Sequence, residues 1–550
     1  MKYLIIFFSL LLVFLNSTLL AQEKGQLSGD FTLNASFYDL DSNIGTTTTQ
    51  YLRELSSADS WLYLDYRYEG WQFNMRYDLF HNSPLLNPIE AYSAQGIGFF
   101  SVRKDIDNVN ITAGHFYDQI GAGLIYRAFE ERQIGLDYAT RGVRVEYRPF
   151  KDFMIKGFTG QQKNRLGVFD PIIKGASAEY YKKLGKRLSI VPGAGIVNRT
   201  IDQSTMQIVA DQINSYPLED RFIPKYNVYA YSFFNRLSYK SIGWYVEYAG
   251  KTDDVIRDQG GRLRLRDGNA IYTALNYSRK GFGISGQYRR IDNFEIRTSP
   301  EQILLEGLVN YLPSLNRQNA YTLPARYNGA AIAEGEEGVQ FEVTWTPKKD
   351  NTIMLNFSDI HRLNGEKLFR EYLIDYYRKH SINTKTRFGL QAVDYNQEVY
   401  EFKPTAPMVQ TLTPYVELSQ KLDRKKSLRV ELQYMITQRN TRINALLNNV
   451  FKTNHNETGA EQDLGDFALA LAELNIAPKY SISVSDMVNT KPTESEKMVH
   501  YYSFFGAFTQ KQTRFSLGYV KQVEGVVCTG GVCRVEPAFS GMRFGLTTNF

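Results

Sequence analysis

The densest group of chemically active side chains in this sequence is a charged run between Gly123 and Arg141. The stretch GLIYRAFEERQIGLDYATR holds both signs of charge close together, at Arg127, Glu130, Glu131, Arg132, Asp137 and Arg141. Opposed charges across a narrow aqueous opening create a transverse field that selects solutes by charge and shape. A short surface helix with solvated charges explains the same pattern, and the sequence leaves both interpretations open.

The histidines form no catalytic or metal-binding motif. They are scattered at His81, His115, His361, His380, His455 and His500, with neither an HExxH pair nor a GxSxG elbow. The stretch DLDSNIG (39–45) has a glycine at position seven of a calcium loop instead of six, and its twelfth residue, Gln50, is not acidic. We therefore expect no enzyme, no metal and no cofactor, although separate strands can assemble a site that spacing does not reveal.

The two cysteines, Cys528 and Cys533, lie close together in VVCTGGVCRVEP. Exported proteins meet an oxidising compartment, and Gly530-Gly531 lets the four intervening residues close a tight ring. Metal binding would need further ligands, and no histidine is near in sequence. The spacing predicts a disulfide that stiffens a surface loop.

The elements that would position these residues show a strand pattern. Residues 61–80, WLYLDYRYEGWQFNMRYDLF, alternate apolar and polar side chains on both sides of Glu69-Gly70, a two-residue turn in which glycine supplies a positive φ. The apolar face continues through the hairpin, because Tyr68 and Trp71 pair across the turn. Half of a soluble sandwich has the same alternation. The pattern recurs, however, at 142–158, 238–250, 273–290, 339–359, 420–435 and 505–520.

Longer polar connections separate these hairpins, at 41–56, 83–93, 118–138, 200–221, 296–335, 441–463 and 489–497. Short turns on one side and long loops on the other are typical of an outer-membrane barrel. The sequence therefore predicts an all-β transmembrane antiparallel β-barrel of about 24 strands (roughly 22–26), with short periplasmic turns and long extracellular loops. Trp71, Trp244 and Trp345 lie near proposed short turns, where an aromatic girdle belongs, whereas Trp61 points inward.

Composition agrees with this class of protein. Aromatic residues make up 14% of the chain, yet the mean hydropathy is only −0.36, which suits an apolar band outside and polar residues inside. The net charge of +6 is too small to indicate nucleic acid as a partner, and no nucleotide-binding motif is present.

Both ends of the chain carry signals of export. Lys2 and the apolar run 4–15 predict a signal peptide at residues 1–21, which leaves 22–550 as a single outer-membrane barrel domain. Strand one is expected at 26–40, and we therefore expect no N-terminal plug domain before the barrel. The last residues on the lipid-facing side of the final strand resemble the signal read by the barrel-assembly machinery, at Phe544, Leu546 and Phe550.

The insert at 296–335 is the longest connection. Within it, Ser299, Pro300 and Gln302 fit the start of a helix, and the apolar spacing that follows predicts a short amphipathic helix over 299–312. Such a helix must bury its apolar face. We expect it to pack into the lumen as a plug, with docking against an envelope partner protein as the alternative.

Four segments resemble an outer-membrane family of the Bacteroidota that is known only as a domain of unknown function. They are GAGLIYRAFEERQIGLDYATRGVRVEYRPF (121–150), DFALALAELNIAPKYSISVSDMVN (466–489), HYYSFFGAFTQKQTRFSLGYVKQ (500–522) and CTGGVCRVEPAFSG (528–541). The resemblance implies an outer-membrane barrel in a Bacteroidota-type envelope. It implies no activity, because the family has none assigned.

A barrel of this size is too wide for wall side chains alone to fill. We therefore expect a porin-like passive channel in the cell outer membrane for small hydrophilic solutes, surrounded by outer-membrane lipid. The alternative is a non-conducting structural, assembly or secretion component that binds envelope proteins.

Overall fold

The computed structural model describes residues 25–550 except 48, 87–89, 259, 304, 407, 439–440, 453–464, 493–497 and 530–531. The predicted signal peptide at 1–21 lies outside the described residues. No helix in the described part of the chain is long and apolar enough to span a membrane.

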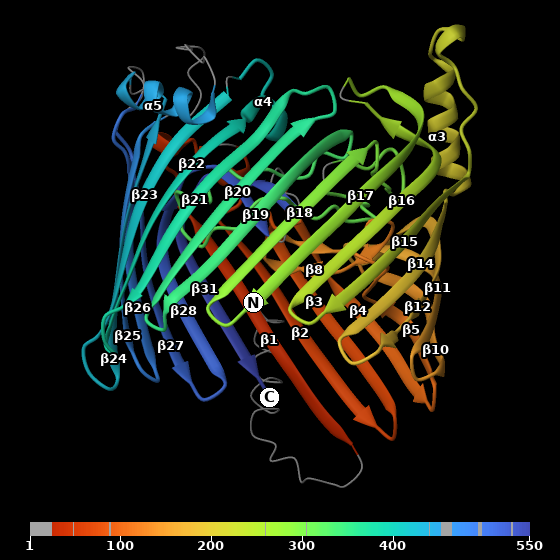
Figure 1. Ribbon diagram of the computed structural model, residues 1–550, viewed down its shortest axis with the longest axis horizontal. Coiled ribbons are helices and arrows are strands. Elements are labelled where there is room, and N and C mark those ends of the chain that lie inside the picture. Colours follow the sequence, from red (N-terminus) through yellow and green to blue (C-terminus); the bar gives the residue numbers. More distant parts are fainter. Residues whose placement is uncertain are drawn as a thin grey trace.

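One closed antiparallel sheet forms the wall of a barrel (Figure 1). Over the described residues it contains 25 strands, of which β12 and the short β13 both pair with β14 and form one interrupted wall strand. The wall therefore has 24 positions, and the predicted strand number is confirmed. Closure occurs where β1 pairs with both β2 and β31.

The wall strands follow one another in chain order around the barrel. They are β1 (Gln26–Tyr38), β2 (Ser56–Tyr68), β3 (Trp71–Ser83), β4 (Tyr92–Ile106), β5 (Val109–Phe116), β10 (Thr140–Phe150), β11 (Phe153–Asn164), β12 (Gly167–Tyr180), β13 (Lys182–Leu184), β14 (Leu188–Thr200), β15 (Asn227–Tyr239), β16 (Ile242–Arg257), β17 (Leu263–Arg279), β18 (Phe282–Asp292), β19 (Gly335–Lys348), β20 (Asn351–Arg362), β21 (Lys367–Lys379), β22 (Thr384–Asn396), β23 (Met408–Lys421), β24 (Lys426–Thr437), β25 (Phe467–Ile476), β26 (Tyr480–Asn489), β27 (His500–Gln510), β28 (Thr513–Gln522) and β31 (Phe539–Asn549).

The remaining elements belong to the connections. They are η1 (Ser42–Ile44), α2 (Thr49–Arg53), β6 (Asp118–Gln119), β7 (Arg127–Ala128), β8 (Glu130–Glu131), η2 (Arg132–Ile134), β9 (Leu136–Asp137), α3 (Gln203–Asn214), η3 (Leu218–Asp220), α4 (Gln397–Tyr400), α5 (Thr441–Phe451), β29 (Gly525–Thr529) and β30 (Val532–Glu536).

The β2–β3 hairpin shows how the sequence builds the wall. Glu69 and Gly70 both adopt positive φ, at 44° and 74°, and Tyr68 pairs with Trp71 as predicted. Two consecutive residues in the left-handed conformation form a tight turn, and the twist of this turn matches the twist of the paired strands. Such short turns gather at the lower end of the barrel in Figure 1, and the long connections gather at the upper end.

The aromatic girdle lies where the sequence indicates. Trp71, Trp244 and Trp345 are 41%, 43% and 49% exposed on the outer wall beside short turns, at the level where a membrane interface places tryptophan. Trp61 points inward and is 5% exposed.

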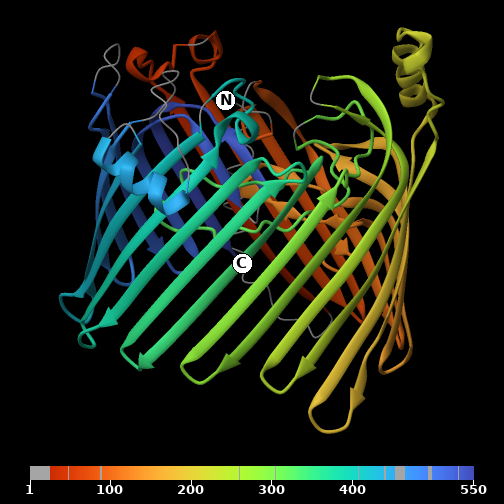
Figure 2. The same ribbon diagram turned by 45° about the horizontal axis from the view of Figure 1, so that its top comes forward.

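Helix α5 packs against the outside of the wall at the loop end (Figure 2). Leu447 and Phe451 are fully buried against the outward-facing Ala392. Beneath the helix, Arg370 Nε donates to Asp359 Oδ1 at 2.8 Å, and its Nη1 donates to the Phe451 carbonyl at 3.4 Å. The helix therefore covers a charged pair on the outer rim of the barrel.

The last long connection forms the β29–β30 hairpin, in which Cys528 is the direct register partner of Cys533. The side chains of both cysteines lie outside the described part of the structure, so the disulfide stays a prediction.

The lumen is not uniformly polar, in contrast to the sequence-based expectation. Two apolar clusters lie inside the wall, and each joins a connection to inward-facing strand residues. In the first cluster, Leu124 and Ile125 from the segment 118–139 pack with residues of β12 to β18. In the second, Leu315 and Leu323 from the insert pack with residues of β20 to β26. Figure 2 shows green segments of this insert crossing the lumen.

The prediction of an amphipathic helix over 299–312 is wrong. Residues 300–301 and 305–307 form turns, and Arg297 pairs with Leu308 in an isolated bridge, so the chain reverses direction here. Gly307 adopts φ +68° and its carbonyl accepts from the amide of Thr298 at 2.8 Å. A left-handed glycine ends a helical path, which explains why the helix-start residues produce only a turn.

The seam between the first and last strands is closed by the final residue. The amide of Phe550 donates to the Gly29 carbonyl at 3.0 Å, and the Gly29 amide donates to the Phe550 carbonyl at 2.9 Å. A Cβ at position 29 would lie 2.6 Å from Cζ of the Phe550 ring and 2.6 Å from the Tyr63 carbonyl. The absence of a side chain at Gly29 thus leaves the space that the Phe550 ring occupies.

We predict that Gly29→Ala weakens the seam by about 1–3 kcal/mol, because the added methyl group overpacks this space. The measurement is the temperature at which the folded, compact band disappears in a heat-modifiability gel. Gly243→Ala is the matched control, since nothing lies within 4 Å of its Cβ position. Equal midpoints for the two variants would show that the Gly29–Phe550 contact does not secure the seam.

Candidate functional site

The segment 118–139 enters the barrel and folds back on itself through two short ladders, β6 with β7 and β8 with β9. Its tip is apolar: Leu124 and Ile125 are fully buried against the wall. The wall leaves room for this tip at Gly195 on β14, where a Cβ would lie 2.4 Å from Ile120 Cγ2. The segment is therefore a fixed part of the lumen filling.

A second set of bonds joins this segment to the insert. The amide of Arg127 donates to the Val309 carbonyl at 2.9 Å, and the amide of Tyr311 donates to the Gly123 carbonyl at 2.9 Å. The guanidinium of Arg127 stacks between aromatic rings, 4.0 Å from the centroid of Tyr311 and 4.6 Å from that of Phe129. We call the combined body of residues 118–139 and 293–334 the lumenal partition.

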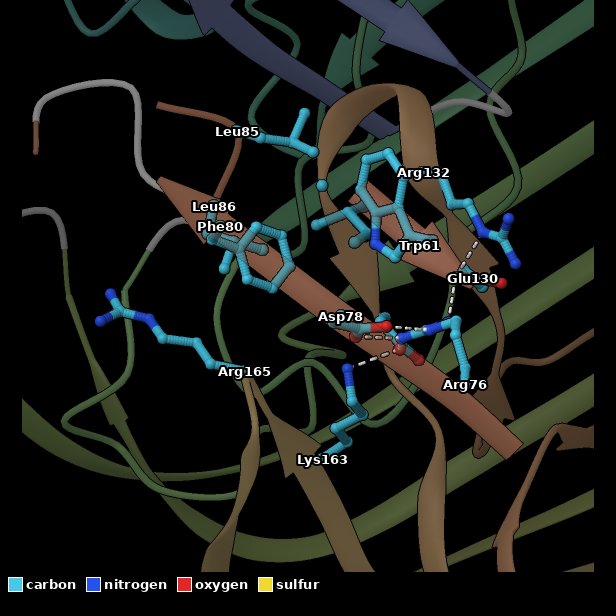
Figure 3. Close-up of a pocket in the computed structure, with 13 residues that line it drawn as sticks. Trp61, Arg76, Asp78, Phe80, Leu85, Leu86, Glu130, Arg132, Lys163 and Arg165 are labelled. Carbon is cyan, nitrogen blue, oxygen red and sulfur yellow. Dashed lines mark hydrogen bonds and ion pairs between the residues drawn. The ribbon is translucent and has the colours of Figure 1, made fainter. Parts of the chain in front are cut away.

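The charged face of the partition is held by Arg76 on β3 (Figure 3). Arg76 is 2% exposed, and it donates to Asp78 through Nε at 2.6 Å and through Nη2 at 2.9 Å. It also binds Asp137 through Nη2 at 2.7 Å and Glu130 through Nη1. A buried charge is stable only when paired and hydrogen-bonded, so this network fixes the loop to the wall.

Asp137 lies at the centre of the network and outside the membrane-spanning wall. Lys163 Nζ donates to its Oδ2 at 2.7 Å, and Tyr117 Oη donates to its Oδ1 at 2.9 Å. Burial alone would raise the pKa of Asp137, but Lys163 and Arg76 outweigh it and lower that pKa to about 2. The carboxylate is therefore ionised over the whole physiological range.

The structure brings together only part of the predicted constriction. Glu130, Arg132 and Asp137 meet in the network, where Arg132 Nε donates to Glu130 Oε1 at 2.9 Å. Glu131 is half-buried and makes no ion pair among the described residues. Arg141 does not belong to the site. The hydroxyl of the preceding residue, Thr140, contacts Tyr126 inside the barrel. Because strand residues alternate between faces, Arg141 lies on the outer face together with the exposed Val143.

Sequence reasoning missed the wall residues that hold the loop, Arg76, Asp78 and Lys163. A partial signal existed, because Arg76 and Asp78 lie two apart on the inward face of a strand. Nothing in the local pattern says that a segment some 55 residues later supplies their partners. His115 is buried beside this region, and no group of three or more acidic, histidine or cysteine residues in the described chain has metal-site geometry.

A cavity of about 700 Å³ remains between the lumenal partition and the inner face of β1, β2, β28 and β31. Its charged lining residues are Asp59, Arg132, Arg534, Glu536 and Arg543. Asn34 on the inner face of β1 is exposed, so this side of the lumen is accessible to water. A smaller pocket of about 30 Å³ is lined by Trp61 and by residues of the Arg76 network (Figure 3).

Comparison with known proteins gives one family and a common fold. A model described as "Family of unknown function (DUF6029)" matches residues 1–550. None of the curated proteins matches. The P pilus usher (PapC) translocation pore has 9% identity and a TM-score of 0.44, over 95% of this chain and 99% of that chain.

Two further solved structures are similar to this chain at a comparable level. The E. coli P pilus tip assembly intermediate PapC-PapD-PapK-PapG has 10% identity and a TM-score of 0.48, over 97% of this chain and 62% of that chain. A BenF-like porin from Pseudomonas fluorescens Pf-5 has 10% identity and a TM-score of 0.34, over 75% and 93%. At these identities and TM-scores the likeness assigns no function to this chain.

We predict that Gly98→Ala on β4 disrupts the Arg76 network. The added Cβ would lie 1.7 Å from Asp78 Oδ2, so the carboxylate must leave Arg76. Removing one partner of a buried ion pair costs about 3–5 kcal/mol, and thermal unfolding in detergent should report a loss of this order. Gly96→Ala, two residues earlier on the same strand, meets its nearest atom at 3.6 Å and serves as the control. Equal unfolding midpoints would contradict the role of Asp78.

We predict that Asp137 makes barrel stability sensitive to acid. Its folded pKa of about 2 is below the ordinary value of 3.8, so its contribution is complete above about pH 5 and is lost as pH falls from about 4 to 2. The contribution is on the order of 2 kcal/mol. Unfolding midpoints of the wild type and Asp137→Asn should differ most at neutral pH and converge below pH 4. A difference that does not change with pH would refute the assignment.

Proposed function

The chain belongs to this family of unknown function, and we propose that its barrel is a passive outer-membrane channel for small hydrophilic solutes. In this proposal the solute path is the water-accessible cavity beside the lumenal partition. The observation that carries it is the asymmetry of the lumen: two apolar clusters fill it from β11 to β26, whereas the side along β1 and β31 keeps a water-accessible cavity whose lining includes charged and hydroxyl side chains.

The partition acts as a fixed constriction in this proposal. Leu124, Ile125 and Leu315 have no exposed surface, and the ion pairs of Arg76 are buried. Displacing the partition would expose these apolar side chains and separate buried charges, both at high cost. Solutes therefore pass beside the partition, and Arg132 is its charged residue that faces the path.

The proposed route to the membrane follows from the two ends of the chain. Residues 1–21 act as a signal peptide, and Phe544, Leu546 and Phe550 are read by the barrel-assembly machinery before the seam closes. The resemblance of four segments to a Bacteroidota family supports an envelope of that type. The contact of Phe550 with Gly29 supports a role for the last residue in closure.

A non-conducting scaffold that binds envelope proteins is the second candidate. The insert 296–335 lies in the lumen with Leu323 buried, which favours the plug interpretation over docking through this insert. The observation that favours a scaffold lies elsewhere, in the connection between α3 and β15. There Leu218 and Ile223 are 82% and 85% exposed. Exposed large apolar side chains at neighbouring positions are a feature of protein-binding surfaces.

We predict that the purified, folded barrel conducts ions in planar bilayers and that Arg132→Ser shifts its selectivity toward cations. The shift should shrink at 1 M salt, where the Debye length is about 3 Å. Arg141→Ser, which removes the same charge from the outer face, is the control and should leave selectivity unchanged.

The opposite outcome is equally clear. If the folded barrel gives no conductance, and a folded variant lacking 123–138 and 299–328 also gives none, the channel proposal fails. The scaffold function would then be the favoured proposal, and copurification of envelope proteins would identify the partners of the barrel.

A further inference from the structure

Arg543 is a cation of the cavity that makes no direct ion pair with a carboxylate among the described residues. It lies on the inner face of β31, opposite Ser36 of β1 and Gly518 of β28. Its guanidinium lies 4.2 Å from the centroid of the Phe539 ring, and Nη2 donates to Gln522 Oε1 at 3.3 Å. Among the described residues, no carboxylate lies within ion-pair distance of this guanidinium. A guanidinium has five N–H donors, so most of its donor capacity is available.

The two other arginines of the cavity are already paired. Arg132 binds Glu130 at 2.9 Å, and Arg534 Nε binds Glu536 Oε1 at 2.7 Å. Arg534 also donates to the carbonyl of Ile134 at 3.0 Å, so it ties the last connection to the partition. These two side chains join parts of the cavity wall through ion pairs and hydrogen bonds, whereas Arg543, within the described part of the chain, makes only the hydrogen bond to Gln522 and the ring contact with Phe539.

The neutral lining around Arg543 suits hydroxyl groups. Thr32, Asn34 and Ser36 follow one another along the inner face of β1, and Ser516 lies on β28. Hydroxyl and amide side chains both donate and accept hydrogen bonds. The rings of Tyr38, Trp61 and Phe539 add flat apolar surface to the same cavity. A lining that combines hydroxyl and amide side chains with aromatic faces matches a compact ring or chain that carries several hydroxyls.

We propose that this cavity is a binding subsite for small hydroxylated organic anions, in which Arg543 binds the carboxylate or phosphate group. The planar guanidinium presents paired N–H donors that match both groups, and stacking on Phe539 holds its orientation. The inference rests on the proposed channel function and names its solute class.

Binding is measured on the folded barrel in detergent by tryptophan fluorescence. Trp61 lines the cavity, whereas Trp71, Trp244 and Trp345 lie on the outer wall, and Trp61→Phe identifies the signal. The probes are D-glucuronate and inorganic phosphate, with D-glucose as the neutral analogue. We expect saturable binding of both anions and weaker binding of glucose. Arg543→Gln should raise the dissociation constant for glucuronate at least about tenfold, as the loss of a charge-assisted hydrogen bond does.

Two variants control for charge and folding. Arg236→Gln removes one inward positive charge from β15, outside the cavity, and should leave binding unchanged. Arg543→Lys keeps the charge at the seam and should bind more tightly than Arg543→Gln. Heat-modifiability confirms that each variant is folded.

Two results would overturn the proposal: glucuronate affinity unchanged in Arg543→Gln, or glucose bound as tightly as glucuronate by the wild type. Failure of the channel function is a separate outcome, because bilayer conductance measures it directly. If the barrel conducts but binds no anion, the channel proposal stands and the subsite proposal is wrong. If anion binding depends on Arg543 but the barrel does not conduct, the subsite proposal stands and the channel proposal is wrong.

Discussion

In the hydrocarbon of a bilayer, backbone N–H and C=O groups can bond only to one another, and this constraint governs the whole molecule. The backbone groups of each wall strand bond to those of its neighbours, and β1 pairs with β31, so the sheet has no unpaired edge strand. A closed wall with 24 positions is too wide for its own side chains to fill. The connections must therefore either fill the lumen or leave it open, and this chain does both.

The filling is held by two different kinds of interaction. Apolar side chains such as Leu124 and Leu323 seal the partition against opposite parts of the wall. The face toward β3 is held instead by buried charges around Arg76, each neutralised by a partner from the wall or the loop. Because a buried ion pair depends on accurate geometry, that face is also the one most easily disrupted by a small change such as a methyl group at Gly98.

The wall residues that the partition does not cover determine the chemical character of the remaining cavity. The inner faces of β1 and β31 carry short polar side chains and Arg543, and the partition contributes Arg132 on the facing side. A narrow aqueous path with low-dielectric walls focuses the field of such charges. If the barrel is the channel proposed above, the position of a few arginines in this space, more than the width of the wall, sets which solutes it selects.

The sequence by itself determined the wall. Alternation in segments such as 61–80, the Glu69-Gly70 turn and the interfacial position of Trp71 are local properties, and they predict the hairpins and the number of strands. The lumen was decided only by the tertiary structure. The salt bridge between Arg76 and Asp137 joins residues far apart in the chain, and Gly307 reverses a segment whose local pattern favours a helix. Alternation assigns each residue to a face, but contacts across the lumen depend on where the connections return, and no local period encodes that.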